Sequence, residues 1–383
     1  MKLPIYLDYN ATTPVAPEVA SAIRPWLEEH FGNPSSSHLY GQRARQAVAQ
    51  ARNHVASLIG AQADEIVFTG SATEANNLAL LGIARALGDS KRHIVISAVE
   101  HPAIMQPALH LRELGWDVTI VPVDTTGRVN VADVAEALRS DTALVSVMHA
   151  NNEVGTIQPM AEIAAVARAN GTLIHTDAAQ SAGKVEIDVA ALGVDLLTLA
   201  GHKFYAPKGV GALYVRRGVP IQPILFGADQ EHGLRPGTEN VPYIVGIGEA
   251  ARLARARLPA ATRHLGELRD TLHRQLLDAV PGLLLNGHPQ YRLPNTLHVS
   301  FPGVSGRDLL AAAANEVAAS VGSACHSDAD AVSGVLAAMD CSATQARGAV
   351  RLSVGMNTSM AEIARAATIL ADAFAQVIAG GRS

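Results

Sequence analysis

The sequence predicts an α/β fold in which a mainly parallel sheet is covered by helices on both faces. Six short runs are rich in Val, Ile and Leu and are typical of buried strands: 93–101, 117–123, 143–150, 172–179, 195–201 and 211–217. Between them lie alanine-rich stretches, such as 160–170, in which apolar residues recur at helical spacing. Strands that alternate with helices favour parallel pairing, and such sheets bind ligands beyond the carboxyl ends of their strands.

The pattern changes at about Val241, where a long stretch rich in alanine, leucine and arginine predicts connecting helices. A strand candidate at 295–301 and further helical segments follow it. We therefore expect a large domain over 16–261. A smaller α+β domain would be built from 1–15 and 262–383.

Composition excludes several classes of protein. The 383-residue chain has a formal net charge of −5 and no basic tail, which argues against a nucleic-acid partner. No signal peptide is apparent and no apolar run reaches the roughly 18 residues of a membrane span, so we expect a cytoplasmic protein. Its two cysteines, Cys325 and Cys341, make a disulfide framework improbable, and we interpret Cys341 as structural. No metal site is expected.

The strongest local signal is Lys203, which directly follows a buried strand in AGHKFYAPKGVGALYV. A lysine there either closes the strand at the surface or forms a Schiff base with an aldehyde. Asp177 ends the preceding strand candidate, 26 residues earlier. A carboxylate there is either a turn residue or the partner of a protonated ring nitrogen, as a pyridoxal-phosphate (PLP) site requires.

Two further segments fit such a site. FTGSATEANNLALLGIARAL (68–87) gives a strand, a turn and a helix, so the amides of Ala72 and Thr73 would face an anion such as phosphate. His101 ends another strand candidate. It is either structural or placed to stack on a cofactor ring and move protons.

Cys325 lies among small and polar residues in VGSACHSDADAVSGVL, which indicates an exposed thiol on a loop and favours a nucleophile over a core residue. Its neighbour His326 would lower the thiol pKa when protonated. Arg351 occupies a strand-like run, where it either captures a substrate carboxylate or forms a structural salt bridge.

Taken together, these residues resemble the cysteine desulfurase and selenocysteine lyase family of class V aminotransferase-like, PLP-dependent enzymes. The resemblance extends nearly from end to end of the chain. It rests on ordered blocks: YLDYNATTP, FGNPSS, FTGSATEANN, VEH, HANNEVGTIQP, HTDAAQSAGK, GHKFYAPKGVGALYVRRG, RPGTEN, RLPNT and GSACHS. It implies the type I PLP fold, with a seven-stranded type of sheet in the large domain.

The resemblance also implies roles for single residues. Lys203 would hold the cofactor aldehyde, Asp177 would pair with the pyridine nitrogen, and His101 would stack on the ring. The remaining implied roles are phosphate binding by Ala72, Thr73 and His202, contacts to cofactor or substrate by Asn152 and Gln180, substrate binding by Asn33, carboxylate binding by Arg351, and a phosphate contact by Thr238 across a homodimer. Gln180 is expected near the phenolic oxygen, and Cys325 would take the substrate's sulfur as a persulfide.

We therefore expect a cysteine desulfurase that converts L-cysteine to L-alanine and passes sulfur to an acceptor protein. The family often has serine where this chain has Ala200, and the loop HSDADAVSGVL replaces the usual Leu-Glu-Pro-Ser stretch. The Ala-Cys-His-Ser-Asp run and VRLSVG look more like the selenocysteine lyase branch, so release of selenide from selenocysteine is the alternative. An aminotransferase and a non-catalytic scaffold are less favoured.

Overall fold

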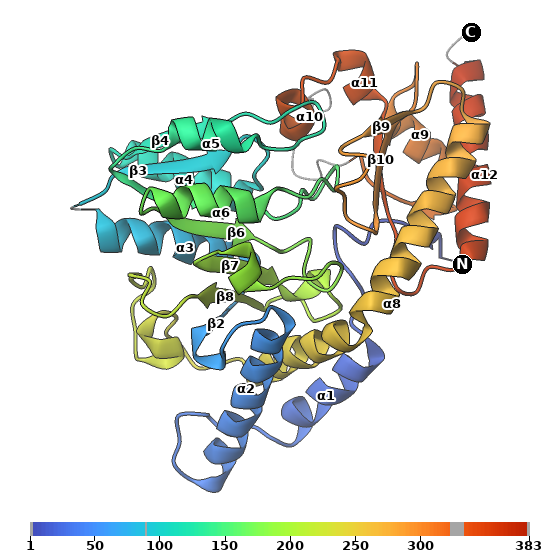
Figure 1. The fold of residues 1–383 in the computed structure, drawn as a ribbon. Coiled ribbons are helices and arrows are strands. Elements are labelled where there is room, and N and C mark those ends of the chain that lie inside the picture. Colours follow the sequence, from blue (N-terminus) through green and yellow to red (C-terminus); the bar gives the residue numbers. More distant parts are fainter. Residues whose placement is uncertain (1–2, 89, 322–332, 381–383) are drawn as a thin grey trace.

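The computed structural model describes residues 3–88, 90–321 and 333–380. Within them a large sheet and two small sheets are surrounded by helices, and the large sheet lies apart from the small ones (Figure 1). This arrangement confirms the predicted α/β class and the seven-stranded sheet.

The large sheet has the strand order β2-β8-β7-β6-β5-β3-β4. Its strands are β2 (Ile66–Thr69), β3 (His93–Ser97), β4 (Asp117–Val121), β5 (Thr142–Ser146), β6 (Leu173–Asp177), β7 (Leu196–Ala200) and β8 (Gly211–Val215). Neighbouring strands pair in parallel except at β8, which is antiparallel to both β2 and β7. Five of the six predicted strand runs contain one of these strands, and the sixth, 143–150, overlaps β5, which begins one residue earlier at Thr142.

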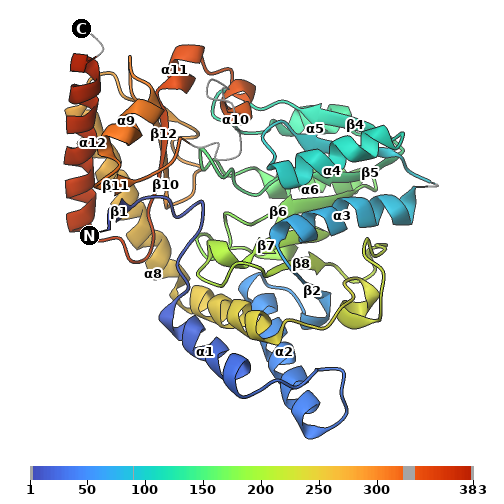
Figure 2. The ribbon, with the colours of Figure 1, turned by 180° about the vertical axis from the view of Figure 1, so that it is seen from behind.

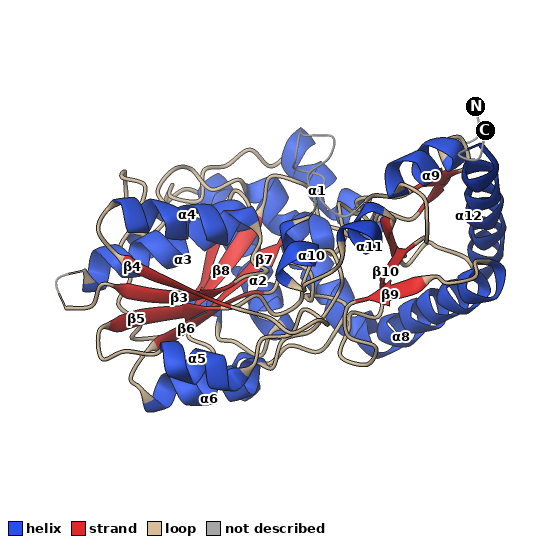
Figure 3. Cartoon of the chain, turned by 90° about the horizontal axis from the view of Figure 1, so that it is seen from above, coloured by secondary structure: helices blue, strands red, loops and turns tan. Residues whose placement is uncertain are grey.

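Helices cover both faces of this sheet, with α3 and α4 on one face and α5 and α6 on the other (Figure 3). The helices of this part are α1 (Pro17–Glu28), α2 (Leu39–Leu58), α3 (Ala72–Leu87), α4 (Pro102–Glu113), α5 (Val131–Ala137), α6 (Met160–Ala169) and α7 (Val189–Leu192), with 3₁₀ turns η1 (Ala63–Glu65), η2 (Gly201–Lys203) and η3 (Gln230–Gly233). Ile94 packs into the cluster under α3 and α4, and the next residue, Val95, packs into the opposite cluster. Strands buried on both faces explain the continuous apolar runs in the sequence.

The second part of the chain is built on β12-β10-β9, an antiparallel sheet, and on the parallel pair of β1 and β11. Its strands are β1 (Ile5–Tyr6), β9 (Leu284–Asn286), β10 (Thr296–Ser300), β11 (Val317–Ala318) and β12 (Ala349–Ser353), and its helices are α9 (Gly306–Ala313), α10 (Gly334–Ala338), α11 (Ala343–Arg347) and α12 (Met360–Gly380). The β1–β11 pair brings the start of the chain beside this part, as Figure 2 shows from behind. The predicted strand at 295–301 is confirmed as β10.

One helix, α8 (Val241–Ala279), runs through both parts, where the sequence predicted several connecting helices. Val241 and Ile247 pack into the core beneath the large sheet, whereas Leu268 and Leu276 pack into the core of the second part. Packing at both ends keeps the helix continuous past Pro259. The expected boundary at 261–262 falls inside this helix, and the domain division stays a prediction.

Helix α12 is long and apolar enough to span a membrane by length and composition, which the sequence expectation did not anticipate. Ile363, Ala366 and Leu370 are buried in the core of the second part, where α12 packs against α8 and α9. Burial of one apolar face in a core is typical of an amphipathic helix in a folded domain.

Candidate active site

A cavity of about 520 Å³ lies at the carboxyl ends of the central strands of the large sheet. It is bounded by the loop at Asn10, the start of α3, the strand ends near Asp177 and Lys203, and Arg351 from β12. The lining includes eight residues predicted for the site: Ala72, Thr73, His101, Asn152, Asp177, Gln180, Lys203 and Arg351; His202 lines it as well. The structure thus brings nine predicted residues from distant parts of the chain into one cavity.

Asp177 ends β6 and is 5% exposed. Its carboxylate accepts hydrogen bonds from the Asn76 side-chain amide at 2.7 Å and from the Ala179 backbone amide at 2.9 Å. Among the described residues it forms no ion pair with a cation. A buried carboxylate that is held by two neutral donors would form a favourable ion pair with a cationic group that enters the cavity.

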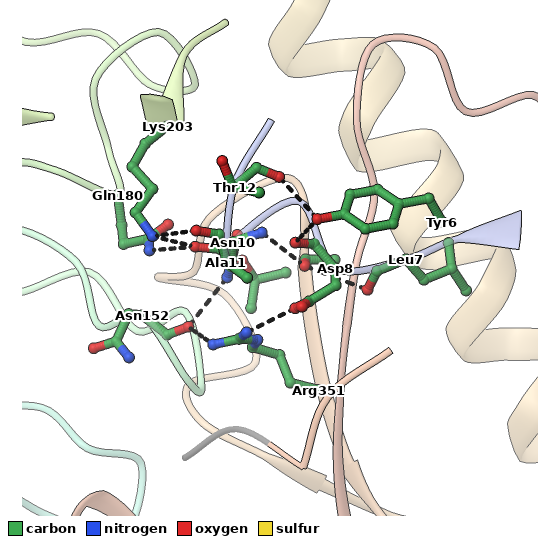
Figure 4. Close-up of polar contacts among 12 residues, drawn as sticks. Tyr6, Leu7, Asp8, Asn10, Ala11, Thr12, Asn152, Gln180, Lys203 and Arg351 are labelled. Carbon is green, nitrogen blue, oxygen red and sulfur yellow. Dashed lines mark hydrogen bonds and ion pairs between the residues drawn. The ribbon is translucent and has the colours of Figure 1, made fainter. Parts of the chain in front are cut away.

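Lys203 closes η2, immediately after β7. Its Nζ donates to the backbone carbonyl oxygens of Asn10 at 2.6 Å and Ala11 at 2.8 Å (Figure 4). The Gln180 side-chain amide donates to the same Asn10 oxygen at 3.0 Å. The Lys203 amine therefore lies at the edge of the cavity, beside the side-chain amide of Gln180 as a second nitrogen donor.

His101 is the N-cap of α4, where its Nδ1 accepts from the Ala103 amide at 3.1 Å, and Pro102 occupies the first helical position. Burial lowers the pKa of His101, the ammonium of Lys203 lowers it further, and the carboxylate of Asp177 opposes both. The imidazole that lines the cavity is therefore held in its neutral form at neutral pH.

The start of α3 lies at another edge of the cavity. Ser71 caps the helix by accepting from the Glu74 amide at 3.1 Å, so Ala72 and Thr73 form its first turn at the cavity wall. His202 Nδ1 lies 3.1 Å from the Thr12 hydroxyl, and burial lowers the pKa of His202 to about 4. Amides at the start of a 16-residue helix make this edge suited to an anion.

Arg351 lies on β12 and is 3% exposed. Its guanidinium bonds the Asp8 carboxylate at 2.7 Å and the Asn152 backbone oxygen at 3.0 Å (Figure 4). The predicted salt-bridge role is therefore real. The ion pair is compatible with the predicted binding of a carboxylate, because Arg351 also lines the cavity.

Three predicted residues are not placed in this cavity. Asn33 lies in the exposed loop between α1 and α2, where its side chain accepts from the Ser35 amide at 2.9 Å. Thr238 lies in an exposed segment between η3 and α8. Neither lines the cavity. Cys325 falls outside the described residues.

Sequence reasoning missed several lining residues as site candidates, among them Asn10, Asn76 and Glu100. Asn10 is 1% exposed and joins the two parts of the chain, because its side chain bonds Asn152 O, Thr296 Oγ1 and Asn295 Nδ2. Asn76 holds Asp177, and the buried Glu100 lines the cavity one residue before His101. Their only sequence signal is their position inside the blocks YLDYNATTP, EANN and VEH.

The comparisons with known proteins agree with this geometry. The model of the aminotransferase class-V family matches residues 5–366. A cysteine desulfurase IscS from Dictyoglomus turgidum is 44% identical over 364 residues, which covers 95% of this chain and 92% of that protein. A solved NifS-like protein superposes with a TM-score of 0.91 at 36% identity, covering 97% of this chain and 99% of that one.

A further solved structure, SspA in complex with cysteine, has a TM-score of 0.82 and 35% identity, and covers 92% of this chain and 99% of that chain. The family match spans most of the chain, and the relative from Dictyoglomus turgidum is similar over nearly its whole length. This protein therefore belongs to the aminotransferase class-V family and, within it, to the cysteine desulfurases.

Proposed function

We propose that this protein is a PLP-dependent cysteine desulfurase that converts L-cysteine to L-alanine and places the sulfur on Cys325 as a persulfide. One observation carries the proposal: Lys203 and a buried Asp177 without a cationic partner among the described residues line the same cavity. The name of the Dictyoglomus relative and the cysteine bound to SspA support this substrate.

The residues of the cavity fit PLP. Asp177 matches a protonated ring nitrogen, the first turn of α3 matches a phosphate, and Lys203 offers the amine that an aldehyde requires. When bound, PLP supplies an aldehyde for the substrate amine and an electron-poor ring that withdraws electrons from the substrate carbons. Burial lowers the pKa of His101, so its neutral ring is suited to lie against this ring.

The chain's own residues would then orient the substrate and move protons. Arg351, fixed by Asp8 and by the Asn152 carbonyl, would hold the substrate carboxylate. The Lys203 amine would carry a proton between substrate carbons. Its Nζ already rests on the carbonyls of Asn10 and Ala11, which accept hydrogen bonds from a protonated amine.

In the proposed sulfur transfer, one bond to the substrate sulfur forms as another breaks. The Cys325 thiolate attacks the substrate sulfur, an S–S bond forms and the Cβ–S bond of the substrate breaks. The electron pair of that bond stays with the substrate carbon, which takes up a proton. L-cysteine and the Cys325 thiol thus give L-alanine and a Cys325 persulfide, with no external oxidant or reductant.

The test is a paired assay of the purified protein with L-cysteine and L-selenocysteine, in which alanine, sulfide and selenide are all quantified. We expect alanine from cysteine with wild type, and loss of persulfide and sulfide formation in Cys325→Ser. A kcat/KM that strongly favours selenocysteine, with negligible sulfide, would establish the lyase alternative, which the Ala-Cys-His-Ser-Asp run favours. Amino-group transfer to a keto acid would indicate an aminotransferase, and failure to gain visible absorption with PLP would indicate a scaffold.

Assembly and location complete the proposal. Thr238 is exposed and lies outside the cavity of its own chain, as expected for a residue that reaches a phosphate in a second subunit. We propose a homodimer with shared active sites in the cytoplasm, which passes sulfur to an acceptor protein. Light scattering should give twice the mass of the 40.0 kDa chain, and Thr238→Ala should weaken PLP binding without changing that mass.

A further inference from the structure

Lys184 is a buried amine that the proposed reaction does not use. It is 6% exposed and lies in the turn that follows Asp177. Its Nζ is 2.9 Å from the backbone oxygen of Gln180 and 3.2 Å from the side-chain oxygen Oε1 of the same residue. Within residues 3–88, 90–321 and 333–380 it has no carboxylate partner. A buried ammonium without a counter-charge is costly, so its placement calls for a reason.

The contacts of Lys184 fix the orientation of the Gln180 amide. A lysine ammonium can only donate, so the atom facing it must be Oε1. The Asn10 backbone carbonyl on the other side can only accept, so the atom facing it at 3.0 Å must be Nε2. The donor on one side and the acceptor on the other therefore require the same orientation of the Gln180 amide.

This orientation places an N–H donor beside the reactive lysine. The Asn10 oxygen that accepts from Gln180 Nε2 also accepts from Lys203 Nζ at 2.6 Å (Figure 4). Lys184 lines a second cavity, of about 310 Å³, which Lys203 also borders. Lys184 lines this second cavity and not the active-site cavity, whereas Gln180 lines the active-site cavity.

The charges around Lys184 couple it to Lys203. Burial, with smaller effects of the cations Lys203 and Arg351, lowers the pKa of Lys184 to about 7. Like charges act reciprocally, so a protonated Lys184 disfavours a proton on the nitrogen of Lys203. In the pH range near and below 7, where Lys184 carries its proton, removal of its charge should therefore make that nitrogen easier to protonate.

We propose that Lys184 is a positioning residue that holds the Gln180 amide with its N–H beside Lys203 and so sets the protonation of the Lys203 nitrogen. The inference rests on the proposed function, because it concerns Lys203 in the PLP-loaded protein. It is tested by the visible absorbance of that protein, which reports the protonation of the Lys203–cofactor linkage independently of turnover.

The experiment follows the absorbance of PLP-loaded wild type and Lys184→Met as a function of pH. We expect the midpoint of the Lys184→Met titration to lie higher by roughly 0.5 to 1 pH unit. Lys184→Arg, which retains charge and donors, should restore the wild-type midpoint. Lys184→Gln, which keeps a donor without the charge, should give a smaller upward shift. It replaces Lys184→Met as the test variant if the methionine variant does not fold.

Thr262→Val is the matched structural control. The Thr262 hydroxyl donates to the Lys184 carbonyl at 2.7 Å, so this variant loosens the same turn and leaves the amine in place. Its midpoint should equal that of wild type. In a Gln180→Ala background, Lys184→Met should shift the midpoint by less than it does in wild type, because part of its effect passes through Gln180.

The two proposals fail in different ways. Wild type that gains no visible absorption with PLP would refute the proposed function. PLP-loaded Lys184→Met with an unchanged midpoint would refute only the role of Lys184, as would an equal shift in Thr262→Val.

Discussion

Asn76 and Asp177, 101 positions apart in the sequence, are joined by a hydrogen bond of 2.7 Å from Asn76 Nδ2 to Asp177 Oδ2. The first lies on α3 and the second at the end of β6, and both are buried. The helix whose first turn borders the anion edge of the cavity thus also holds the carboxylate expected to face a cation. Asn76 thereby links the two ends of the proposed cofactor site.

Asn76→Ala should weaken PLP binding. It removes a donor from a buried carboxylate, a loss of roughly 1.5–3 kcal/mol for a hydrogen bond to a charged group. Since Asp177 is then less firmly oriented, we expect the PLP affinity of the cofactor-free protein to fall about tenfold or more. A titration of that protein with PLP measures it. Asn77→Ala, which loses a bond to the Thr73 carbonyl of the same helix, is the control. Equal affinities for the two variants would contradict the prediction.

Arg351→Lys should impair substrate binding more than the chemical step. An ammonium cannot bond Asp8, the Asn152 carbonyl and a substrate carboxylate in the fixed geometry of a guanidinium. We expect kcat/KM for cysteine to fall about 30- to 100-fold, mainly through KM. Steady-state kinetics with the exposed Arg347→Lys as control check this. A fall in kcat with KM unchanged would assign Arg351 to the reaction itself.

Much of the site could be predicted because its residues follow strand ends. Asp177 and Lys203 come directly after apolar runs, and parallel strands carry such residues to one edge of a sheet. Asn10 could not be placed in this way. Its buried contacts join it to Asn295 and Ser353, 285 and 343 positions away, and no local pattern encodes them.

The second part of the chain was harder to predict for a similar reason. β1 and β11 are two residues each, so they carry no alternation that a pattern could reveal. The continuity of α8 was missed because Pro259 and the change in composition suggest a break. Its ends instead pack into separate cores, and tertiary contacts outweigh local propensity there.

Glu231→Ala should strongly destabilise the fold. Its carboxylate forms two hydrogen bonds with Arg52, at 2.6 and 2.7 Å, and accepts from the Phe68 amide at 2.8 Å. The side chains of Glu231 and Arg52 are only 3% and 15% exposed, so the variant leaves a largely buried guanidinium without its carboxylate partner. We expect the free energy of unfolding to fall by about 3–5 kcal/mol. Chemical denaturation measures this, with Glu18→Ala at the exposed Arg257 pair as a control that should change little. Similar losses in the two variants would contradict the prediction.

Glu100 should make the stability of the protein fall as pH rises. Burial outweighs the hydrogen bonds from Ser97 and Met148 and, with a smaller contribution from Asp177, raises the pKa of its carboxyl to about 8. Between the unfolded value of 4.5 and 8, the folded carboxyl keeps a proton that the unfolded one has lost. The unfolded state then binds fewer protons, so the stability that this group contributes is complete below pH 4.5 and is lost up to pH 8.

Glu100→Gln should remove this dependence, because the amide does not titrate and its oxygen can still accept from Ser97 and Met148. From pH 5 to 8 the free energy of unfolding of wild type should fall relative to that of Glu100→Gln, by on the order of a few kcal/mol. Urea denaturation of the cofactor-free proteins at each pH gives this difference. The exposed Glu28→Gln controls for the loss of one surface charge and should follow the wild-type slope. Parallel curves for wild type and Glu100→Gln would mean that the carboxyl ionises in the folded protein as readily as in the unfolded chain.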